Sequence, residues 1–442
     1  MPLENTYDDD KKDATHMETG GSFIIEGLAG AHTLEGDIPV SGAKNDILKI
    51  MAGALLFEDA VHIENVPDVL DVIALSAILE EIGVSVEHTE TGIVLSSPKQ
   101  AHTVLPEDRA KKLRASVVLT GPLLSRYGSV SFPHPGGCVI GARPIDIFVN
   151  SFELMGATYI QNDTHYTLSA PQGLHGADIF FHIASVTATE TLMMAAVLAR
   201  GTTILRNVAM EPEIQNLAQY LVASGANIQG VGTPTITIVG GELLHAREKT
   251  YTVIPDRIEA GSFAILAALA GKEVHITNCN PLHIRSLLSV FDSAGVLYTQ
   301  DKTSLTIRKP HEPYHCTSVR THEYPGFSTD LQAPLTIFLT QAQGEGLVFE
   351  TLFEGRLRYT DDIVRMGADI TMFDPHRVLV RGPNQLVGKN LEAPDLRAGL
   401  AYIIAGIIAS GTSNVRVARH IDRGYSHIEK RLQKIGVDIT RV

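Results

Sequence analysis

Apolar and polar residues along this chain of 442 residues follow a pattern that recurs about every 70 residues. Each repeat contains a short alternating run, typical of a strand, and two apolar-rich segments that are typical of helices. The second helix of each repeat ends at a glycine followed by Ala or Val, namely Gly83, Gly156, Gly225, Gly295, Gly367 and Gly436. Their spacings are 73, 69, 70, 72 and 69 residues, so the sequence predicts six copies of one unit.

The glycine at each helix end suits the left-handed backbone conformation that closes many helices. Matching strands are predicted at residues 61–63, 130–132, 203–205, 274–276, 347–349 and 415–417. Helices that are apolar nearly all round, and therefore buried, are predicted at 46–56, 114–124, 187–199, 260–270, 331–340 and 396–409. Alternating helices and strands indicate an α/β class, and the period fits either one ring of six copies or two groups of three.

The composition limits the classes of partner. Lys plus Arg total 36 and Asp plus Glu total 50, so the net charge is −14. We therefore expect no nucleic acid or membrane partner, and an anionic substrate would need a local basic cluster. Three scattered cysteines are too few for a disulfide framework, which favours a reducing, cytoplasmic location. Residues 1–20 are polar, and we expect them to form a disordered tail outside the fold.

One cysteine stands in a segment that favours a loop. Residues 133–137, Pro-His-Pro-Gly-Gly, come directly before Cys138, and Arg143 follows five residues later. Clusters of Pro and Gly mark loops, and a nearby cation lowers the pKa of a thiol. The alternative is a small buried side chain in a turn, although the two glycines leave little for the thiol to pack against. The segment is typical of a reactive cysteine.

Charged residues recur at the starts of the buried helices, at Lys44, Arg114, Asp330, Asp395 and Arg397. An aspartate at such a position suits helix capping as well as catalysis, and the sequence leaves both roles open. An arginine there opposes the helix dipole, which indicates a bound anion or a buried partner. No metal-ligand spacing, dinucleotide motif or P-loop occurs in the sequence, so these residues suit a dianionic substrate and acid–base chemistry without a cofactor.

The motifs as a set resemble the UDP-N-acetylglucosamine 1-carboxyvinyltransferases, a family of enolpyruvyl transferases. The resemblance covers residues 23–442 and rests on segments 42–45 (Gly-Ala-Lys-Asn), 135–138 (Pro-Gly-Gly-Cys), 141–144 (Gly-Ala-Arg-Pro), 211–213, 255–259, 329–330, 395–398 and 420–425. It implies an α/β fold, a two-domain inside-out α/β barrel of six βαβαββ units, three per domain, with a cleft between the domains. One domain would contain residues 21–44 and 253–442, and the other, residues 45–252, would carry the Cys138 loop.

The resemblance also implies the reaction. An enolpyruvyl group would pass from phosphoenolpyruvate to the 3′-hydroxyl of UDP-N-acetylglucosamine, with release of phosphate and no cofactor, as the first committed step of peptidoglycan precursor synthesis. The hydroxyl would add to C2 while C3 takes a proton, and phosphate would then leave. The expected partners are these two small molecules. A paralogue that uses another UDP- or nucleotide-linked acceptor is the alternative.

Residue by residue, the resemblance implies that Cys138 is the acid toward C3 and the target of fosfomycin, that Asp330 is the base for the acceptor hydroxyl, and that Asp395 shares the proton handling. The phosphate and carboxylate of phosphoenolpyruvate would be bound by the basic residues Lys44, Arg114, Arg143, Arg397 and Arg423. Of these, Lys44 is also assigned a catalytic role. The positions expected around the UDP-sugar are Asn45, Arg143, Asp146, Ser185, Val186 and Leu352.

The chain departs from the family pattern at several positions. Ile183 stands where a lysine near the diphosphate is common, and Thr187 replaces a glycine. Asp46 follows Lys44-Asn45 where a small residue is usual, and Gly355 replaces an asparagine. Shikimate-type enolpyruvyl transferases share the fold, but the Asn-x-Gly-Thr-x-x-Arg signature of that family is absent from this sequence.

Overall fold

The computed structural model describes residues 21–134, 145–247 and 249–442. Within these ranges the chain forms two compact units. Unit 1 contains residues 21–40 and 255–442, and unit 2 contains residues 41–134, 145–247 and 249–254. The boundaries proposed from the sequence, after residues 44 and 252, lie a few residues from these. The tail expected at residues 1–20 lies outside the described residues.

Unit 2 contains three separate sheets. The first has the order β13 (Thr250–Thr252), β3 (Val61–Glu64), β5 (Gly92–Ser96) and β4 (Ser85–His88). The second has the order β6 (Ser129–Pro133), β8 (His165–Ser169) and β7 (Thr158–Gln161). The third has the order β11 (Asn227–Gln229), β12 (Thr235–Val239), β10 (Thr202–Arg206) and β9 (Asp178–Phe180). The first and third sheets each have one parallel pair of strands at an edge. In the second sheet, the corresponding pairing is a single parallel bridge between Val104 and Ser131.

Unit 1 repeats this arrangement in three four-stranded sheets. The first has the order β15 (Leu297–Gln300), β16 (Ser304–Arg308), β14 (Gly271–Thr277) and β2 (Leu34–Pro39). The second has the order β17 (Val319–Arg320), β18 (Gly344–Phe349), β20 (Arg377–Gly382) and β19 (Asp369–Asp374). The third has the order β21 (Asn390–Glu392), β22 (Thr412–Arg416), β1 (Phe23–Glu26) and β23 (Asp438–Arg441). Strand β1 thus completes the last repeat, with Phe23 opposite both Val415 and Arg441.

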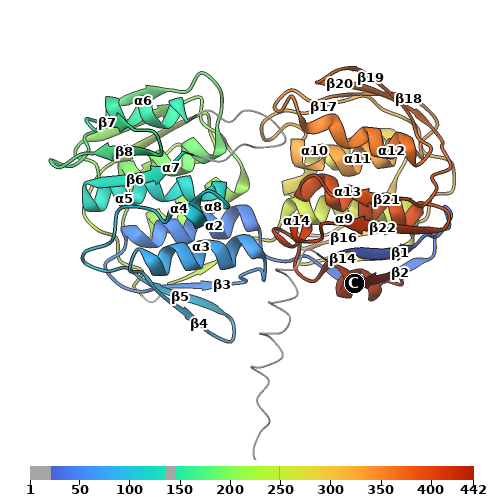
Figure 1. The fold of residues 1–442 in the computed structure, drawn as a ribbon, viewed down its shortest axis with the longest axis horizontal. Coiled ribbons are helices and arrows are strands. Elements are labelled where there is room, and N and C mark those ends of the chain that lie inside the picture. The colour runs from blue at the N-terminus through green and yellow to red at the C-terminus, as the bar shows by residue number, and fades with distance from the viewer. Residues whose placement is uncertain (1–20, 135–144, 248) are drawn as a thin grey trace, which may run out of the picture. The chain divides into compact units, whose positions relative to one another are not determined.

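Three apolar helical segments occupy the interior of each unit, with the sheets outside them (Figure 1). In unit 2 they are α2 (Lys44–Gly53) with η1 (Ala54–Leu56), η2 (Arg114–Leu119) with α5 (Thr120–Tyr127), and α7 (Val186–Val197). In unit 1 they are α9 (Arg257–Ala270), η4 (Thr329–Leu331) with α11 (Gln332–Leu339), and α13 (Leu396–Ile408). Every residue from Ile258 to Ala270 and from Arg397 to Ile408 is buried. These segments are the predicted buried helices.

The other helices are α3 (Leu70–Glu81), α4 (Glu107–Ala110), α6 (Asp146–Leu154), α8 (Pro212–Ala223), η3 (Pro281–Ile284), α10 (Arg285–Ala294), η5 (Arg356–Tyr359), α12 (Thr360–Arg365), α14 (Arg419–Asp422) and α15 (Ile428–Gln433). The six glycines predicted to end the second helix of each repeat all have positive φ, between 85° and 118°. A side chain would be strained in that conformation, which explains the choice of glycine. One predicted strand is shifted, because β22 ends at Arg416 and Val417 has a φ of 63°.

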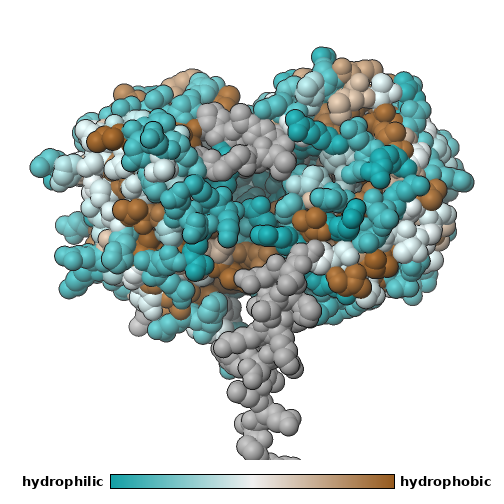
Figure 2. Space-filling view, in the orientation of Figure 1, coloured by the Kyte–Doolittle hydropathy of each residue, from teal (hydrophilic) through white to brown (hydrophobic). Residues whose placement is uncertain are grey.

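The predicted α/β class and the six repeats are confirmed, and the repeats fall into two groups of three. The sheets remain separate among the described residues, so the inside-out arrangement consists of helices inside and open sheets outside. Figure 2 shows hydrophilic residues over most of the visible face, with apolar residues scattered among them. In the part of the chain that the structure describes, no helix is long and apolar enough to cross a membrane.

Candidate functional site

The carboxylate of Asp330 lies between two arginines of unit 1. Arg356 Nη2 donates to Oδ1 at 2.8 Å, and Arg397 donates to Oδ2 from Nε at 3.1 Å. Arg397 Nη2 is 3.0 Å from the same oxygen. The side chains of both arginines are 5% exposed, whereas that of Asp330 is 25% exposed. Two fixed guanidinium groups beside a partly exposed carboxylate form an arrangement that can bind an anion and move a proton.

Asp330 and Asp395 both stand at the start of a buried helix, but their carboxylates have different partners. Asp395 Oδ1 accepts the N–H of Arg397 at 2.8 Å and of Ala398 at 3.1 Å, so Asp395 caps α13. At η4 the capping side chain is Ser328, whose Oγ accepts the N–H of Asp330 at 3.3 Å. The sequence left capping and catalysis open for both aspartates. The structure shows a cap at Asp395 and a pair of arginines at Asp330.

Arg397 is held on another side by Tyr425. Arg397 Nη1 donates to the phenol oxygen at 2.8 Å, and the guanidinium carbon lies 5.6 Å from the centre of the ring. Burial raises the pKa of Tyr425 to about 12, so its hydroxyl stays protonated near neutral pH. A cation in the first turn of α13 opposes the helix dipole, and the partly exposed carboxylate of Asp330 supplies the countercharge that offsets this cost.

The structure adds Arg356, a residue that the sequence analysis did not assign. Arg356 opens η5 directly after Gly355, and its Nη1 donates to Thr329 Oγ1 at 2.8 Å while Nη2 reaches Asp330. Its guanidinium carbon lies 5.4 Å from the centre of the Phe353 ring. The sequence analysis compared Gly355 with the family pattern. No spacing in the nearby sequence, however, indicates that Arg356 contacts Asp330.

In unit 2, the predicted anion-binding residues begin two buried helices. Lys44 is the first residue of α2, and its Nζ lies 3.1 Å from Oδ2 of Asp71, which is in the first turn of α3. Asn45 follows it on α2. Arg114 is half-buried and opens η2, which packs against α2. The repeats thus place Lys44 and Arg114 at equivalent helix starts, as expected.

The structure brings together three of the residues expected around the UDP-sugar. Asp146 begins α6 and is exposed, with its Oδ2 4.0 Å from Nε2 of His182. Ser185 caps α7 by accepting a first-turn N–H at 3.3 Å, and Val186 is the first residue of that helix. Helices α6 and α7 pack against each other. Ile183, close to this cap, is 52% exposed.

The remaining candidates lie in unit 1 or outside the described residues. Leu352 follows β18 and is half-buried. Arg423 directly follows α14, two residues before Tyr425, and is also half-buried. Cys138 and Arg143 lie outside the described residues. Of the described candidates, Asp330, Leu352, Asp395, Arg397 and Arg423 therefore belong to unit 1, and Lys44, Asn45, Arg114, Asp146, Ser185 and Val186 belong to unit 2.

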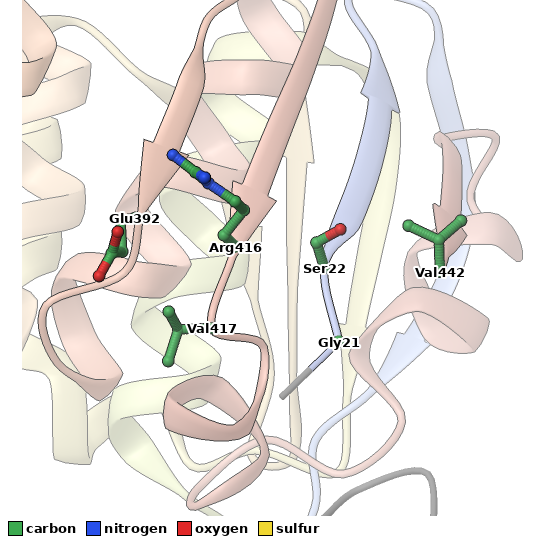
Figure 3. A pocket seen from close by; sticks show the side chains of 6 residues that line it. All are labelled: Gly21, Ser22, Glu392, Arg416, Val417 and Val442. Atoms are coloured by element: carbon green, nitrogen blue, oxygen red, sulfur yellow. The ribbon is translucent and has the colours of Figure 1, made fainter. Parts of the chain in front are cut away.

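Unit 1 also has a shallow pocket beside strands of its third sheet. Figure 3 shows the residues that line it, which lie at or next to the ends of the strands of this sheet: Gly21, Ser22, Glu392, Arg416, Val417 and Val442. None of the candidates predicted from the sequence contributes to it.

Asp46, one of the departures from the family pattern, is a fully buried carboxylate in the first turn of α2. It accepts hydrogen bonds from the hydroxyl of Tyr251, from Asn216 Nδ2 at 2.8 Å and from the N–H of Ile254 at 2.9 Å. Burial raises its pKa to about 7. The bonds from Tyr251 and Ile254 join the start of α2, which carries Lys44, to the segment where the chain leaves unit 2, and the bond from Asn216 joins it to α8.

We expect the free energy of unfolding to fall as the pH rises from about 4 to about 7, partly through Asp46. A carboxyl group whose pKa is raised in the folded state stabilises the fold below its unfolded pKa, and this contribution is lost as the pH passes the folded value. One such group contributes a slope of about 1.4 kcal/mol per pH unit. Glu190, 2.8 Å from Lys49, acts in the same direction, because burial raises its pKa to about 7.

Urea unfolding at a series of pH values measures this slope. Asp46→Asn should decline less steeply than the parent between these pH values, whereas Asp37→Asn, at an exposed position on β2, should keep the parent slope. An unchanged slope in Asp46→Asn would contradict the assignment.

Comparisons with known proteins agree with the motifs. The family model described as EPSP synthase (3-phosphoshikimate 1-carboxyvinyltransferase) matches residues 28–432. Two proteins named UDP-N-acetylglucosamine 1-carboxyvinyltransferase are similar over nearly their whole lengths. That of Caulobacter vibrioides (strain NA1000 / CB15N) is 39% identical over 94% of this chain and 97% of its own. That of Desulfatibacillum aliphaticivorans is 40% identical over 95% of this chain and 99% of its own.

Two solved structures share the fold. The enolpyruvyl transferase NikO from Streptomyces tendae has a TM-score of 0.83 at 22% identity, covering 96% of this chain and 99% of its own. EPSP synthase from Acinetobacter baumannii has a TM-score of 0.73 at 17% identity, covering 96% of this chain and 100% of its own. The extent and identity of the sequence matches assign the family: the chain belongs to the UDP-N-acetylglucosamine 1-carboxyvinyltransferases, within the wider EPSP synthase family.

Proposed function

We propose that the protein transfers the enolpyruvyl group of phosphoenolpyruvate to the 3′-hydroxyl of UDP-N-acetylglucosamine and releases phosphate. The names of relatives that match at least 94% of the chain support this reaction. The observation that carries the proposal is Asp330, whose carboxylate lies between Arg356 and Arg397. We place the reaction in the cytoplasm, in keeping with the low cysteine content, as the first committed step of peptidoglycan precursor synthesis.

Phosphoenolpyruvate carries a phosphate and a carboxylate, and a chain with a net charge of −14 needs local cations to hold them. The proposed ligands are the basic residues Lys44, Arg114, Arg143, Arg397 and Arg423. A substrate anion at Arg397 competes with Asp330 for the same guanidinium N–H groups. Binding of phosphoenolpyruvate therefore weakens the ion pair that holds Asp330 and makes its carboxylate a better base.

The reaction proceeds by addition and elimination. In the addition, the 3′-oxygen bonds to C2, Asp330 takes the hydroxyl proton, and C3 receives a proton from Cys138. In the elimination, C3 gives up a proton, the C2–C3 double bond forms again, and the bond from C2 to the phosphate oxygen breaks. No atom changes its oxidation state overall. Asp395 assists the proton transfers at C3 through Oδ2, because Oδ1 caps α13.

Phosphate release from phosphoenolpyruvate with a panel of acceptors tests the proposal. We expect release with UDP-N-acetylglucosamine, and little with UDP-glucose, UDP-N-acetylgalactosamine or shikimate 3-phosphate. Preference for another UDP-sugar would favour the alternative that the protein is a paralogue with a different acceptor. That alternative is motivated by Ile183, which is 52% exposed near the cap of α7. Release with shikimate 3-phosphate alone would overturn the proposal.

Fosfomycin should alkylate Cys138 alone. The two other cysteines serve as internal controls, because burial raises the pKa of Cys279 to about 11 and raises that of Cys316 above its ordinary value. Neither is therefore a ready thiolate at neutral pH. Intact-mass analysis should find one adduct on the parent and none on Cys138→Ser, and an adduct that maps to Cys279 or Cys316 would contradict the assignment.

A further inference from the structure

Glu350 is a fully buried carboxylate that directly follows β18 in unit 1. Its Oε1 accepts the N–H of Leu352 at 2.9 Å and of Phe353 at 3.2 Å. Its Oε2 accepts the hydroxyl of Thr329 at 2.7 Å. Removing a carboxylate from water is costly unless hydrogen bonds replace the solvent, and these three bonds do so. They also tie Glu350 to two segments on which the proposed function depends.

The first segment is η4, which contains Thr329 and Asp330. Because the hydroxyl of Thr329 donates its proton to Glu350, its oxygen is left to accept from Arg356 Nη1, at 2.8 Å. The same guanidinium donates from Nη2 to Asp330 Oδ1 at 2.8 Å. Among the described residues, Arg356 Nε is buried without a hydrogen-bond partner. The planar guanidinium is therefore held at its two terminal nitrogens, and its orientation depends on Thr329 as much as on Asp330.

The second segment is Leu352–Phe353, which follows Glu350 directly. The carboxylate fixes both of its backbone N–H groups. The backbone of Glu350 is itself anchored, since its N–H donates to the carbonyl of His376 at 2.8 Å and its carbonyl accepts from His376 Nδ1 at 2.7 Å. Hydrogen bonds therefore hold both the main chain and the carboxylate of Glu350, and this one side chain links the two attached segments.

We propose that Glu350 is a positioning residue that aligns the acceptor hydroxyl with its base. It does so by holding Leu352, beside the sugar, and by orienting Asp330 through Thr329 and Arg356. The inference rests on the proposed function, in which Asp330 takes the hydroxyl proton and Leu352 contacts the acceptor. A shift of about 1 Å between reacting groups can reduce a rate about 100-fold, so a residue that fixes both partners has a large effect without contacting substrate.

Glu350→Gln is the first test. Glutamine can still accept the two backbone N–H groups, but its amide must donate toward Thr329, which leaves the hydroxyl proton without an acceptor. We expect kcat to fall at least about 10-fold and KM for UDP-N-acetylglucosamine to rise, with KM for phosphoenolpyruvate nearly unchanged. The acidic limb of the kcat–pH profile should also move to higher pH, because a displaced Arg356 stabilises the ionised Asp330 less. Glu345→Gln, at an exposed position on β18, is the matched control and should behave as the parent.

Thr329 provides a second test that does not remove the buried charge. Thr329→Val keeps the shape of the side chain but loses both hydrogen bonds, and it should reproduce the loss in kcat. Thr329→Ser keeps the hydroxyl, and it should recover most of what Thr329→Val loses. This pair decides the question if Glu350→Gln fails to fold.

The outcomes separate the inference from the proposed function. If the parent releases no phosphate with any acceptor, the proposed function fails. If the parent is active and Glu350→Gln keeps its kcat, acceptor KM and pH profile, the positioning role is wrong. Equal losses in Thr329→Val and Thr329→Ser, with an unshifted pH profile, would also overturn it.

Discussion

Asp330→Asn should abolish phosphate release while UDP-N-acetylglucosamine still binds within about tenfold of the parent, a change of about 1.4 kcal/mol. Asparagine keeps the shape of the side chain and one hydrogen-bond acceptor, but it cannot take a proton from a hydroxyl. A free aspartate, with a pKa of about 3.9, is a weak base, so the transfer requires a site from which water is excluded. Turnover is measured by phosphate release and binding by calorimetry.

The control for this variant is Asp361→Asn, at an exposed position on α12. It should match the parent in both measurements. Helix capping does not account for a loss in Asp330→Asn, since asparagine caps as well as aspartate and Ser328 holds the cap at η4. Turnover of Asp330→Asn close to that of the parent would remove Asp330 from the reaction.

Arg397→Ala should reduce turnover by about 10²–10³-fold, because a preorganised charge at the reacting phosphate contributes about 3–4 kcal/mol to stabilising the transition state. If Arg397 bound only the substrate anion, its loss would leave the melting temperature nearly unchanged. The structure changes that expectation, since Arg397 is buried and its loss leaves Tyr425 without this hydrogen bond and Asp330 with one arginine fewer. We therefore expect a lower melting temperature as well.

Arg397→Lys separates the two effects. Lysine keeps the positive charge and most of the volume, but a single ammonium group cannot reproduce the planar contacts to both Asp330 and Tyr425. Turnover should remain far below that of the parent while the protein folds. Arg416→Ala, at an exposed position on β22 (Figure 3), is the matched control and should be fully active. Near-normal turnover in Arg397→Lys would show that Arg397 has only a structural role.

The parts of the fold that the sequence predicted are those with a local cause. The helix-ending glycines could be predicted because positive φ is a property of one residue and its neighbours. The strand partners of β1 could not be predicted from the repeat pattern, because the chain's first strand pairs with β22 and β23 at its far end. Only the family resemblance implied that residues 21–44 share a domain with 253–442. Such pairing leaves no periodic signal near Phe23, and it becomes evident only when the sheet is assembled.

The candidate site shows the same division. The recurrence of charged residues at helix starts identified Asp330, Asp395 and Arg397 without a structure. Their partners could not be predicted, because one residue type suits both a helix cap and an ion pair. Arg356 was missed because it reaches Asp330 only through the path of the chain after β18. Glu350 carried no signal, since a glutamate at a strand end is usually exposed.

Addition followed by elimination is the central claim, and the product formed in D2O tests it most directly. Addition places a solvent-derived hydrogen on C3, and elimination removes one hydrogen from the same carbon. NMR and mass spectrometry of the product should therefore show an enolpyruvyl group on the 3′-oxygen of UDP-N-acetylglucosamine, deuterium on its vinyl carbon, and one phosphate released per product. A product linked elsewhere, or a 3′-linked product with no deuterium at C3, would contradict the account.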